Sequence, residues 1–541
     1  MTHSSTPNPD PATGAAAADG GWSPGSRRRA VLLSMAMFVL VVDTSLMNVS
    51  IGSVVEDLDT TVSGVQGAIA LEALVSAAFI LIGSKVADLI GRKLAFTLGL
   101  LGYALGALAM ALAQSLTAII VFWAIIGGLG ASLLLPSMQA LIHGNFEGKE
   151  QTKAYALVGA AAAIAAAVGP LLGGFLTTFL SWRVGFMLEV AIIAVVILGL
   201  RDARDVAYTG PREVDVVGAV LSAVGMGGVV IGILVWQEGG EFVGVLIAVG
   251  LVALGSLARW LVRRKAAGKP ALLDSGLFKS DIFRLGITSQ MLQNIALGGV
   301  MIAMPIYLQM VLEYNALETG ITLAPLSLTM FAVALLAGKR GGNQRPAALI
   351  RAGAGLLTVG TFLIALVVPR ADSGWLLAVP LALTGCGLGL LVSQLNNYTL
   401  SPISSERVSE AAGVNSAAGS FGLSFGLAFA GAILLATLSV TFTQMAKDST
   451  VLPPAAQEQV ARALEEDAEV MSNTRLAAQL EGQPQEIQDE VLRINEEARP
   501  LALQVGLLVP IIAGLLGFSN GMRMMKRPDP APSEHAGMVF D

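Results

Sequence analysis

The sequence predicts an all-α protein that crosses a membrane many times, and three observations lead to this fold class. Of its 541 residues, 54% are hydrophobic and 13% are charged, which is more apolar side chain than one soluble core can bury. Apolar runs recur from Ala30 to Phe518, and each is close to the roughly 20 residues that a helix needs to cross a bilayer. The connections between these runs alternate in charge. A membrane β-barrel would show short alternating segments instead.

Fourteen apolar segments are expected to form the transmembrane helices of this polytopic protein. Their expected starts are Ala30, Val65, Leu94, Leu116, Lys153, Val184, Val216, Phe242, Ile282, Glu318, Ala348, Gly374, Glu410 and Leu501. The run from Ile282 to Leu312 contains Pro305, so its helix is expected to be tilted or kinked. Asp215, just before the seventh span, is expected to cap that helix.

The loop charges set the orientation, because cytoplasmic loops carry an excess of Lys and Arg. If Arg27, Arg28 and Arg29 are cytoplasmic, every second connection should be basic. The basic residues of those connections and of the C-terminal tail are Arg92, Lys93, Lys149, Arg201, Arg204, Arg212, Arg263, Arg264, Lys265, Lys269, Lys339, Arg340, Arg345, Arg523, Lys526 and Arg527. Arg183 and Arg370 are exceptions near span ends. An even number of spans with both termini cytoplasmic fits this distribution.

Matched glycine-rich helices indicate an internal repeat. Glycines 159, 169, 173 and 174 lie in the fifth span, and glycines 413, 419, 422, 426 and 431 in the thirteenth. Both helices are fifth in their half if two inserted helices separate two six-helix halves. Such repeats with a midplane site are typical of secondary transporters, although glycine also simply lets helices pack closely. The expected divisions are a disordered cytoplasmic tail (1–29), the N-terminal half (30–203), inserted helices 7 and 8 (204–265), a cytoplasmic linker (266–281), the C-terminal half (282–523) and a second disordered cytoplasmic tail (524–541).

Residues 441–500 are expected to form an extracellular helical hairpin. Its first helix should lie in "PPAAQEQVARALEEDAEVM" and its second, in "QPQEIQDEVLRINEEARPLALQV", should run into the last span. The spacing of Val460, Leu464 and Val470 is helical. The acids of this segment either form a solvated face or attract cationic molecules.

Three carboxyl groups interrupt the apolar runs and are candidates for proton coupling or cation binding: Asp43, Glu72 and Glu189. A charged group inside the bilayer costs about 2.5–3.5 kcal/mol on insertion scales, so its retention indicates a role. Asp43 and Glu72 should lie at similar depths, given the rise of a helix. Glu189 is closer to the outer edge and near Arg183, so a structural ion pair is its alternative reading. For Asp43 and Glu72 the alternative is a hydrogen-bonded structural acid.

Amide side chains in the spans are candidates for lining a substrate cavity. They are Asn48, Gln290, Gln293, Asn294, Gln394 and Asn397. Hydrogen bonds between helices explain such amides equally well.

Two motifs suit a protein whose halves move. In "GSKVADLIGRK", Asp88 can accept hydrogen bonds from helix N-terminal amides, Gly91 permits a turn, and Arg92 and Lys93 mark the cytoplasmic side. These four residues form a candidate conformational latch. "AVGPLLGGFL" is a candidate hinge with these residues: Gly169, Pro170, Gly173 and Gly174.

These stretches resemble motifs of the major facilitator superfamily, the first its signature loop and the second the antiporter motif of its drug exporters. "VVDTSLMNVSIG", "DVVGAVLSAVGMG", "ALETGITLAPLSL" and "GLGLLVSQLNNYTLSP" are similar to motifs of its fourteen-helix drug:proton antiporter family. The resemblance covers nearly the whole membrane part. It implies the major facilitator fold and export of hydrophobic, often cationic drugs, biocides and dyes in exchange for protons.

The sequence departs from that family at four places. Ser84 stands where the loop motif usually begins with Gly, and Gly52 where the first-helix motif usually has Pro. Relatives commonly carry an Arg followed by Gln-Gly in span 4, where this chain has Ala124 and Gly127 before Gly128. That Arg is implied in proton coupling. The chain therefore resembles a subfamily without the usual coupling scheme.

The first alternative is an exporter of an endogenous lipid or metabolite, without the usual proton coupling. The second is a membrane receptor or scaffold that acts through the outer hairpin. No enzyme site competes, because no Gly-rich loop with Lys-Ser/Thr is present and the histidines (His3, His143 and His535) are scattered. One cysteine, Cys386, excludes disulfides and multi-cysteine metal sites. We expect a multi-pass protein of the inner (plasma) membrane that acts as a monomer on a small-molecule substrate and protons, with no cofactor, metal or nucleic acid.

Overall fold

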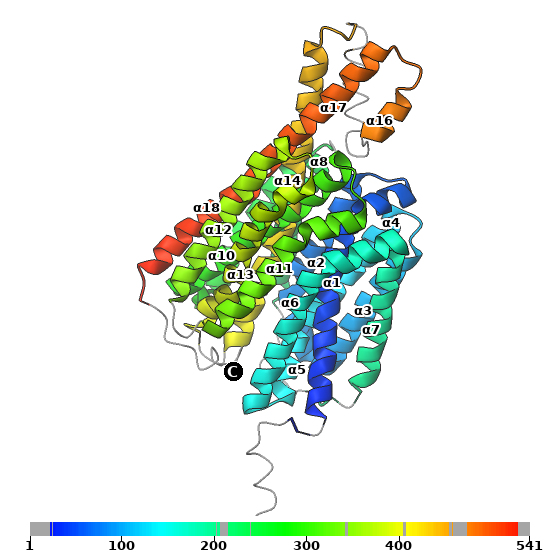
Figure 1. The fold of residues 1–541 in the computed structure, drawn as a ribbon. Coiled ribbons are helices and arrows are strands. Elements are labelled where there is room, and N and C mark those ends of the chain that lie inside the picture. Colours follow the sequence, from blue (N-terminus) through cyan, green and yellow to red (C-terminus); the bar gives the residue numbers. More distant parts are fainter. Residues whose placement is uncertain are drawn as a thin grey trace, which may run out of the picture.

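The computed structural model describes residues 22–23, 25–201, 203–205, 215–237, 240–340, 345–403, 407–453, 457 and 473–528. All regular elements in these ranges are helices (Figure 1). Among the described residues, fourteen helical segments are long and apolar enough to span a membrane. Thirteen of them begin within four residues of the predicted starts, and the fourteenth begins at Gln485.

The helices of the N-terminal half and the inserted pair follow the chain in order. They are α1 (Ser26–Leu58), α2 (Val62–Ile90), α3 (Arg92–Leu112), α4 (Leu116–Ala118), the π-helix η2 (Ile119–Gly127), α5 (Gly128–Asn145), α6 (Gly148–Phe179), α7 (Trp182–Gly199), α8 (Val216–Gln237) and α9 (Val243–Ala266). Because α1 begins at Ser26, Arg27, Arg28 and Arg29 lie in the first helix and not in the expected tail. Arg is a good helix former, so the helix extends beyond its apolar part.

The second part of the chain adds the C-terminal half and the hairpin. Its helices are η3 (Ser275–Lys279), α10 (Asp281–Ile306), the π-helix η4 (Tyr307–Val311), α11 (Ala316–Arg340), α12 (Pro346–Val367), η6 (Val368–Arg370), η7 (Gly374–Leu377), α13 (Ala378–Leu400), α14 (Val408–Asp448), α16 (Asn473–Gln479), α17 (Gln485–Gly506) and α18 (Leu508–Met525). The irregularity expected from Pro305 is present, since α10 gives way to the π-turn η4 directly after it.

The two halves meet along two matched seams. α6 packs against α11, and α2 packs against α14. In each seam the fifth long helix of one half contacts the second long helix of the other, which is the pairing that an internal repeat produces. The inserted helices α8 and α9 pack on each other, and α8 also contacts α2 and α14. The inserted pair therefore packs against the α2–α14 seam through α8.

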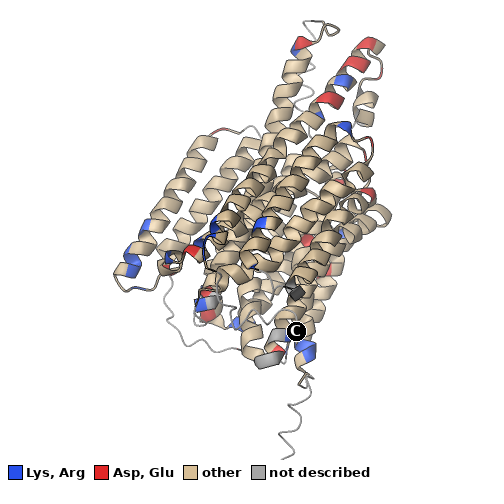
Figure 2. Cartoon of the chain, turned by 60° about the vertical axis from the view of Figure 1, so that its left-hand side comes forward, with Lys and Arg blue, Asp and Glu red and all other residues tan. Residues whose placement is uncertain are grey.

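The spans contain few charged residues, and Lys, Arg, Asp and Glu gather at helix ends and on the hairpin (Figure 2). We call the face at which α1 begins the inner face, following the loop charges. α14 has 41 residues, or about 60 Å of helix, so it is longer than a bilayer is thick. It projects from the outer face together with α16 and α17 (Figure 1). The predicted first hairpin helix, including Val460, Leu464 and Val470, lies outside the described residues.

Asp215 anchors the inserted helices at the inner face. Its carboxylate accepts hydrogen bonds from the backbone N–H groups of Gly218 (3.0 Å) and Leu272 (3.1 Å) and from the indole of Trp260 (3.0 Å). The predicted cap of α8 is thereby confirmed. Burial alone would raise the pKa of Asp215, but these hydrogen bonds and the nearby Arg264 outweigh it and hold the pKa below its usual value.

Replacing Asp215 with Asn is expected to lower the free energy of unfolding by about 1.5–3 kcal/mol, the range for hydrogen bonds to a charged group. Since the folded-state pKa is lowered, this stabilisation is present above the ordinary pKa of about 3.9 and is lost as the pH falls through the folded-state value. Thermal unfolding in detergent at neutral and acidic pH measures both effects. Asp281→Asn is the control, because Asp281 forms more exposed ion pairs with Arg284 and Arg527 that contribute about 1 kcal/mol at most. Equal midpoints for Asp215→Asn and wild type at neutral pH would contradict the assignment.

Candidate functional site

Asp43 lies in the interior of the N-terminal half, with 1% of its surface exposed. Its carboxylate accepts a hydrogen bond from the phenol of Tyr103 on α3. The indole Nε1 of Trp123 on η2 donates a second, at 3.0 Å from Oδ2. Both donors are neutral groups, so they orient the acid without compensating its charge.

Glu72 and Glu189 lie close enough to Asp43 to interact with it electrostatically. The Tyr103 hydroxyl lies within electrostatic range of all three carboxyl groups. Glu189 is 2% exposed, and neither of its oxygens has a hydrogen-bond partner among the described residues. Glu72 is only partly buried. Three acids from α1, α2 and α7 therefore form one cluster inside the first half, which we call the acid cluster.

The expected alternative for Glu189, an ion pair with Arg183, is not what the structure shows. Arg183 forms an ion pair with Asp57 at the outer end of α1 and donates to the carbonyl of Ala113 at 2.7 Å. Six residues separate Arg183 from Glu189, or about 9 Å along the helix. The Arg183 side chain is therefore used at the outer face, while Glu189 lies deeper.

Aromatic side chains form the outer wall of the acid cluster. Trp123 and Phe186 are packed edge to face with their centroids 6.4 Å apart, and Phe186 and Trp182 repeat this geometry at 6.1 Å. All three rings are buried. An acid beside aromatic rings is a chemical setting that suits a desolvated organic cation.

The span that lacks the expected Arg has an unusual geometry. Ala124 and Gly127 both lie in η2, and a π-turn in a helix is frequently found at functional sites. Trp123, the neighbour of Ala124, is the residue of this span that reaches Asp43. The residue beside Ala124 in this span therefore presents a neutral indole N–H to the acid.

The amides named from the sequence are only partly brought together. Gln290 and Asn294 of α10 both lie over Gly419 of α14, where an added Cβ would be 3.4 Å from each amide nitrogen. Buried amide oxygens of Asn48 and Gln293 have no partner among the described residues. Gln394 is buried and Asn397 is partly buried on α13. Among the described residues, these amides make no hydrogen bond to the acid cluster. The acids lie in the first half, and all of these amides except Asn48 lie in the second.

The loop between α2 and α3 is held by a residue that was not predicted. Arg92 donates to Asp88 at 3.2 Å within this loop. Asp205, at the end of the N-terminal half, accepts from the backbone N–H of Lys93 at 3.0 Å. A Cβ at Gly91, whose φ is +100°, would meet the Asp205 carboxylate at 2.6 Å. Asp205 therefore adds a contact to the four proposed latch residues: Asp88, Gly91, Arg92 and Lys93.

The glycines of the antiporter motif serve two different contacts. A Cβ at Gly169 or Gly173 would approach α1 within 2.5 or 2.9 Å. A Cβ at Gly174 would be 2.4 Å from the carbonyl oxygen of Ala316 on α11, and one at Gly320 would be 2.3 Å from that of Pro170. α6 continues through Pro170 to Phe179 without a break. The motif thus permits close approach of α6 both to α1 and, at the outer end of the seam, to the other half.

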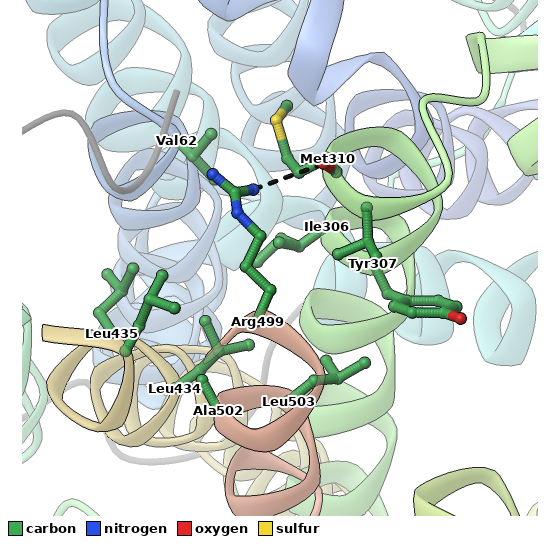
Figure 3. A pocket seen from close by; sticks show the side chains of 11 residues that line it. Val62, Ile306, Tyr307, Met310, Leu434, Leu435, Arg499, Ala502 and Leu503 are labelled. Carbon is green, nitrogen blue, oxygen red and sulfur yellow. Dashed lines mark hydrogen bonds between the residues drawn. The ribbon is translucent and has the colours of Figure 1, made fainter. Parts of the chain in front are cut away.

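A small cavity lies at the outer end of the second seam (Figure 3). Its volume is about 30 Å³, roughly the share of one water molecule in the liquid. Its lining comes from α2, α10, η4, α14 and α17. Arg499 of α17 points into it and donates to the carbonyl of Met310 at 3.5 Å and to Asn495 at 2.8 Å. Arg499 therefore attaches the hairpin helix to η4.

Comparison with known proteins identifies the family. The family model described as Major Facilitator Superfamily matches residues 33–427. The chain belongs to the major facilitator superfamily. It is 28% identical over 415 residues to the multidrug resistance protein Stp of Mycobacterium tuberculosis, covering 76% of each chain. It is 31% identical over 407 residues to the cephamycin export protein CmcT of Amycolatopsis lactamdurans, covering 72% of this chain and 82% of CmcT.

The major facilitator fold is also found by structural comparison. A bacterial homologue of the human lysosomal transporter Spinster, solved in an inward-facing and unoccupied conformation, matches with a TM-score of 0.63 at 12% identity. The match covers 94% of this chain and 100% of that one. The family match, the similarity to multidrug resistance proteins and the fourteen membrane-capable helical segments of the described residues together confirm the resemblance to the fourteen-helix drug-exporter family. The protein is a multi-pass transporter of the inner (plasma) membrane and not an enzyme.

Proposed function

We propose that this transporter exports hydrophobic, often cationic small molecules in exchange for protons. The observation that carries the proposal is the acid cluster: the buried Asp43 lies within electrostatic range of Glu72 and of Glu189, and no Lys, Arg or His among the described residues pairs with these three acids. Because the charged form of a carboxyl is disfavoured away from water, such a cluster holds either protons or a cation. The similarity to Stp, a relative named for multidrug resistance, supports export of drugs.

The proposed cycle uses the two seams. With the site open to the inner face, the acids lose protons and attract a cation, which the aromatic wall receives. With the site open to the outer face, the acids take up protons and the cation leaves. We propose that the six-helix halves move as units about the α6–α11 and α2–α14 contacts in a monomer. Each elementary charge that the cycle moves across the membrane in net adds about 2.3 kcal/mol per 100 mV of membrane potential to the driving force.

Purified protein in liposomes with an imposed pH gradient tests this proposal. A cationic dye inside the vesicles should leave faster when the outside solution is more acidic. The molecules that respond are those inserted with their outer face toward the outside solution. Collapsing the gradient with a protonophore should slow the dye flux to the rate measured without an imposed gradient. Dye flux that does not change with the gradient would overturn proton exchange.

Export of an endogenous lipid or metabolite is the second candidate. The absence of the span-4 Arg at Ala124 and the resemblance to a cephamycin export protein favour it. In a thermal-shift panel of cationic dyes, lipids and neutral antibiotics, stabilisation by dyes alone would count against this alternative.

A further inference from the structure

Gln309 lies on the π-turn η4 and contacts the opposite half of the protein. Pro305 supplies no backbone N–H, so the regular helix is disturbed there, and η4 follows from Tyr307 to Val311. The Gln309 amide nitrogen donates to the carbonyl of Val49 on α1 at 3.0 Å. Its amide oxygen accepts from the backbone N–H of Gly52 at 2.8 Å. One side chain of the second half thus makes two hydrogen bonds to the backbone of the first.

Gly52 permits this contact because it has no Cβ atom. A Cβ at this position would be 2.7 Å from the Gln309 amide oxygen, which is closer than Cβ atoms approach in real proteins. The Pro that similar first-helix motifs carry would also lack the N–H that donates here. The departure from that motif and the contact of Gln309 therefore belong together.

The contact lies on the outer side of the acid cluster. Val49 and Gly52 follow Asp43 by six and nine residues, or about 9 and 13 Å of helix toward the outer face. A separate contact joins the halves on the same side of the membrane, where the backbone N–H of Leu317 on α11 donates to the Thr178 hydroxyl on α6 at 3.0 Å. The outer ends of both halves are therefore held together in this conformation.

We propose that Gln309 holds the outer end of the transport path closed by binding α1, and that its two hydrogen bonds break each time the path opens outward. This assignment rests on the proposed alternating-access function. Gln309 is a positioning residue in this role, since it fixes α1, the helix that carries Asp43, and has no recorded contact with the acid cluster in the described ranges.

Disulfide formation across the other outer contact measures the closure directly. In a Cys386→Ser background, the pair Thr178→Cys and Leu317→Cys should be oxidised rapidly in membranes, because closure brings these positions together. Adding Gln309→Leu should slow the cross-link by about 10-fold, the effect expected for two lost hydrogen bonds. Gln504→Leu is the matched control: its amide donates to the carbonyl of Ala365 at 2.7 Å within one half, so it should leave the rate unchanged.

A second variant reaches the same contact from α1. Gly52→Ala keeps the N–H but places a methyl group against the Gln309 oxygen, and it should also slow the cross-link. Unchanged rates in Gln309→Leu and Gly52→Ala would overturn the inference, as would an equal effect of Gln504→Leu. The readout needs neither substrate nor proton gradient. If the variants cross-link more slowly but the protein exchanges no protons, the proposed function is rejected and the assignment of Gln309 stands. If the protein exports in exchange for protons but the cross-linking rate is unchanged, the assignment of Gln309 is rejected and the proposed function stands.

Discussion

Asp43→Asn is expected to reduce proton-driven dye export by roughly 30-fold or more. The substitution keeps the shape of the side chain but removes its charge and its exchangeable proton. Losing a desolvated contact between a cation and its acid costs about 2–5 kcal/mol, which corresponds to that fall in rate or more. Initial rates in liposomes with an imposed pH gradient, corrected for the amount of inserted protein, give the number.

Asp57→Asn is the matched control for this prediction. Asp57 lies on the same helix, but its carboxylate pairs with Arg183 at the outer face. This change should reduce export by less than about fivefold, because exposed ion pairs contribute about 1 kcal/mol at most. Asp43→Asn protein that exports dye at the wild-type rate with the same dependence on the gradient would remove Asp43 from the mechanism.

Gly174→Ala is expected to impair transport nearly as strongly, although it adds only one methyl group. The new Cβ would lie 2.4 Å from the Ala316 carbonyl oxygen and 2.9 Å from the Leu317 Cα atom. Both neighbours are backbone atoms, so α6 and α11 must separate for the methyl group to fit. Such overpacking typically costs about 1–3 kcal/mol, which shifts a closure equilibrium by about 5- to 150-fold. Export rates and the cross-link between positions 178 and 317 should fall together.

Gly159→Ala provides the comparison on the same helix. A Cβ at Gly159 meets no atom within 4 Å, so the exchange should leave export unchanged or stabilise α6 slightly, since Ala is the better helix former. If both alanine variants behaved alike, the close approach at Gly174 would not be needed for transport.

The spans were predictable because hydropathy is a local property of the chain. The last span was expected at Leu501, and its helical segment starts at Gln485. The earlier start reflects the amphipathic α17, which runs past Pro500 into α18 as the second hairpin helix was predicted to run into the last span. The matched fifth helices were also predictable, since their match depends on glycine content.

The acid cluster was predictable only in part. Asp43, Glu72 and Glu189 stand out as charges in apolar runs. Their surroundings do not, because Tyr103 and Trp123 lie 60 and 80 residues beyond Asp43 in the sequence. Trp123 had one available signal, its place beside the departure at Ala124. The suggested pairing of Glu189 with Arg183 was wrong, because six residues of helix separate the two by about 9 Å along its axis and Arg183 pairs with Asp57 instead.

Contacts between the halves could not be predicted from local patterns. Gln309 is one amide in a long apolar run, and its partners on α1 are 257 and 260 residues away. The role of Asp205 at Gly91 likewise depends on how the sixth span returns to the α2–α3 loop. Such pairs are set by the packing of whole helices, for which one sequence carries little information.

Proton release on substrate binding tests the central claim most directly. Purified protein in weakly buffered detergent solution is mixed with a cationic dye, and a pH indicator counts the protons that leave. If the acids exchange protons for the cation, dye binding should acidify the solution, and the release should vanish when Asp43, Glu72 and Glu189 are all replaced by their amides. Saturable dye binding to the wild type without any proton release would contradict the account.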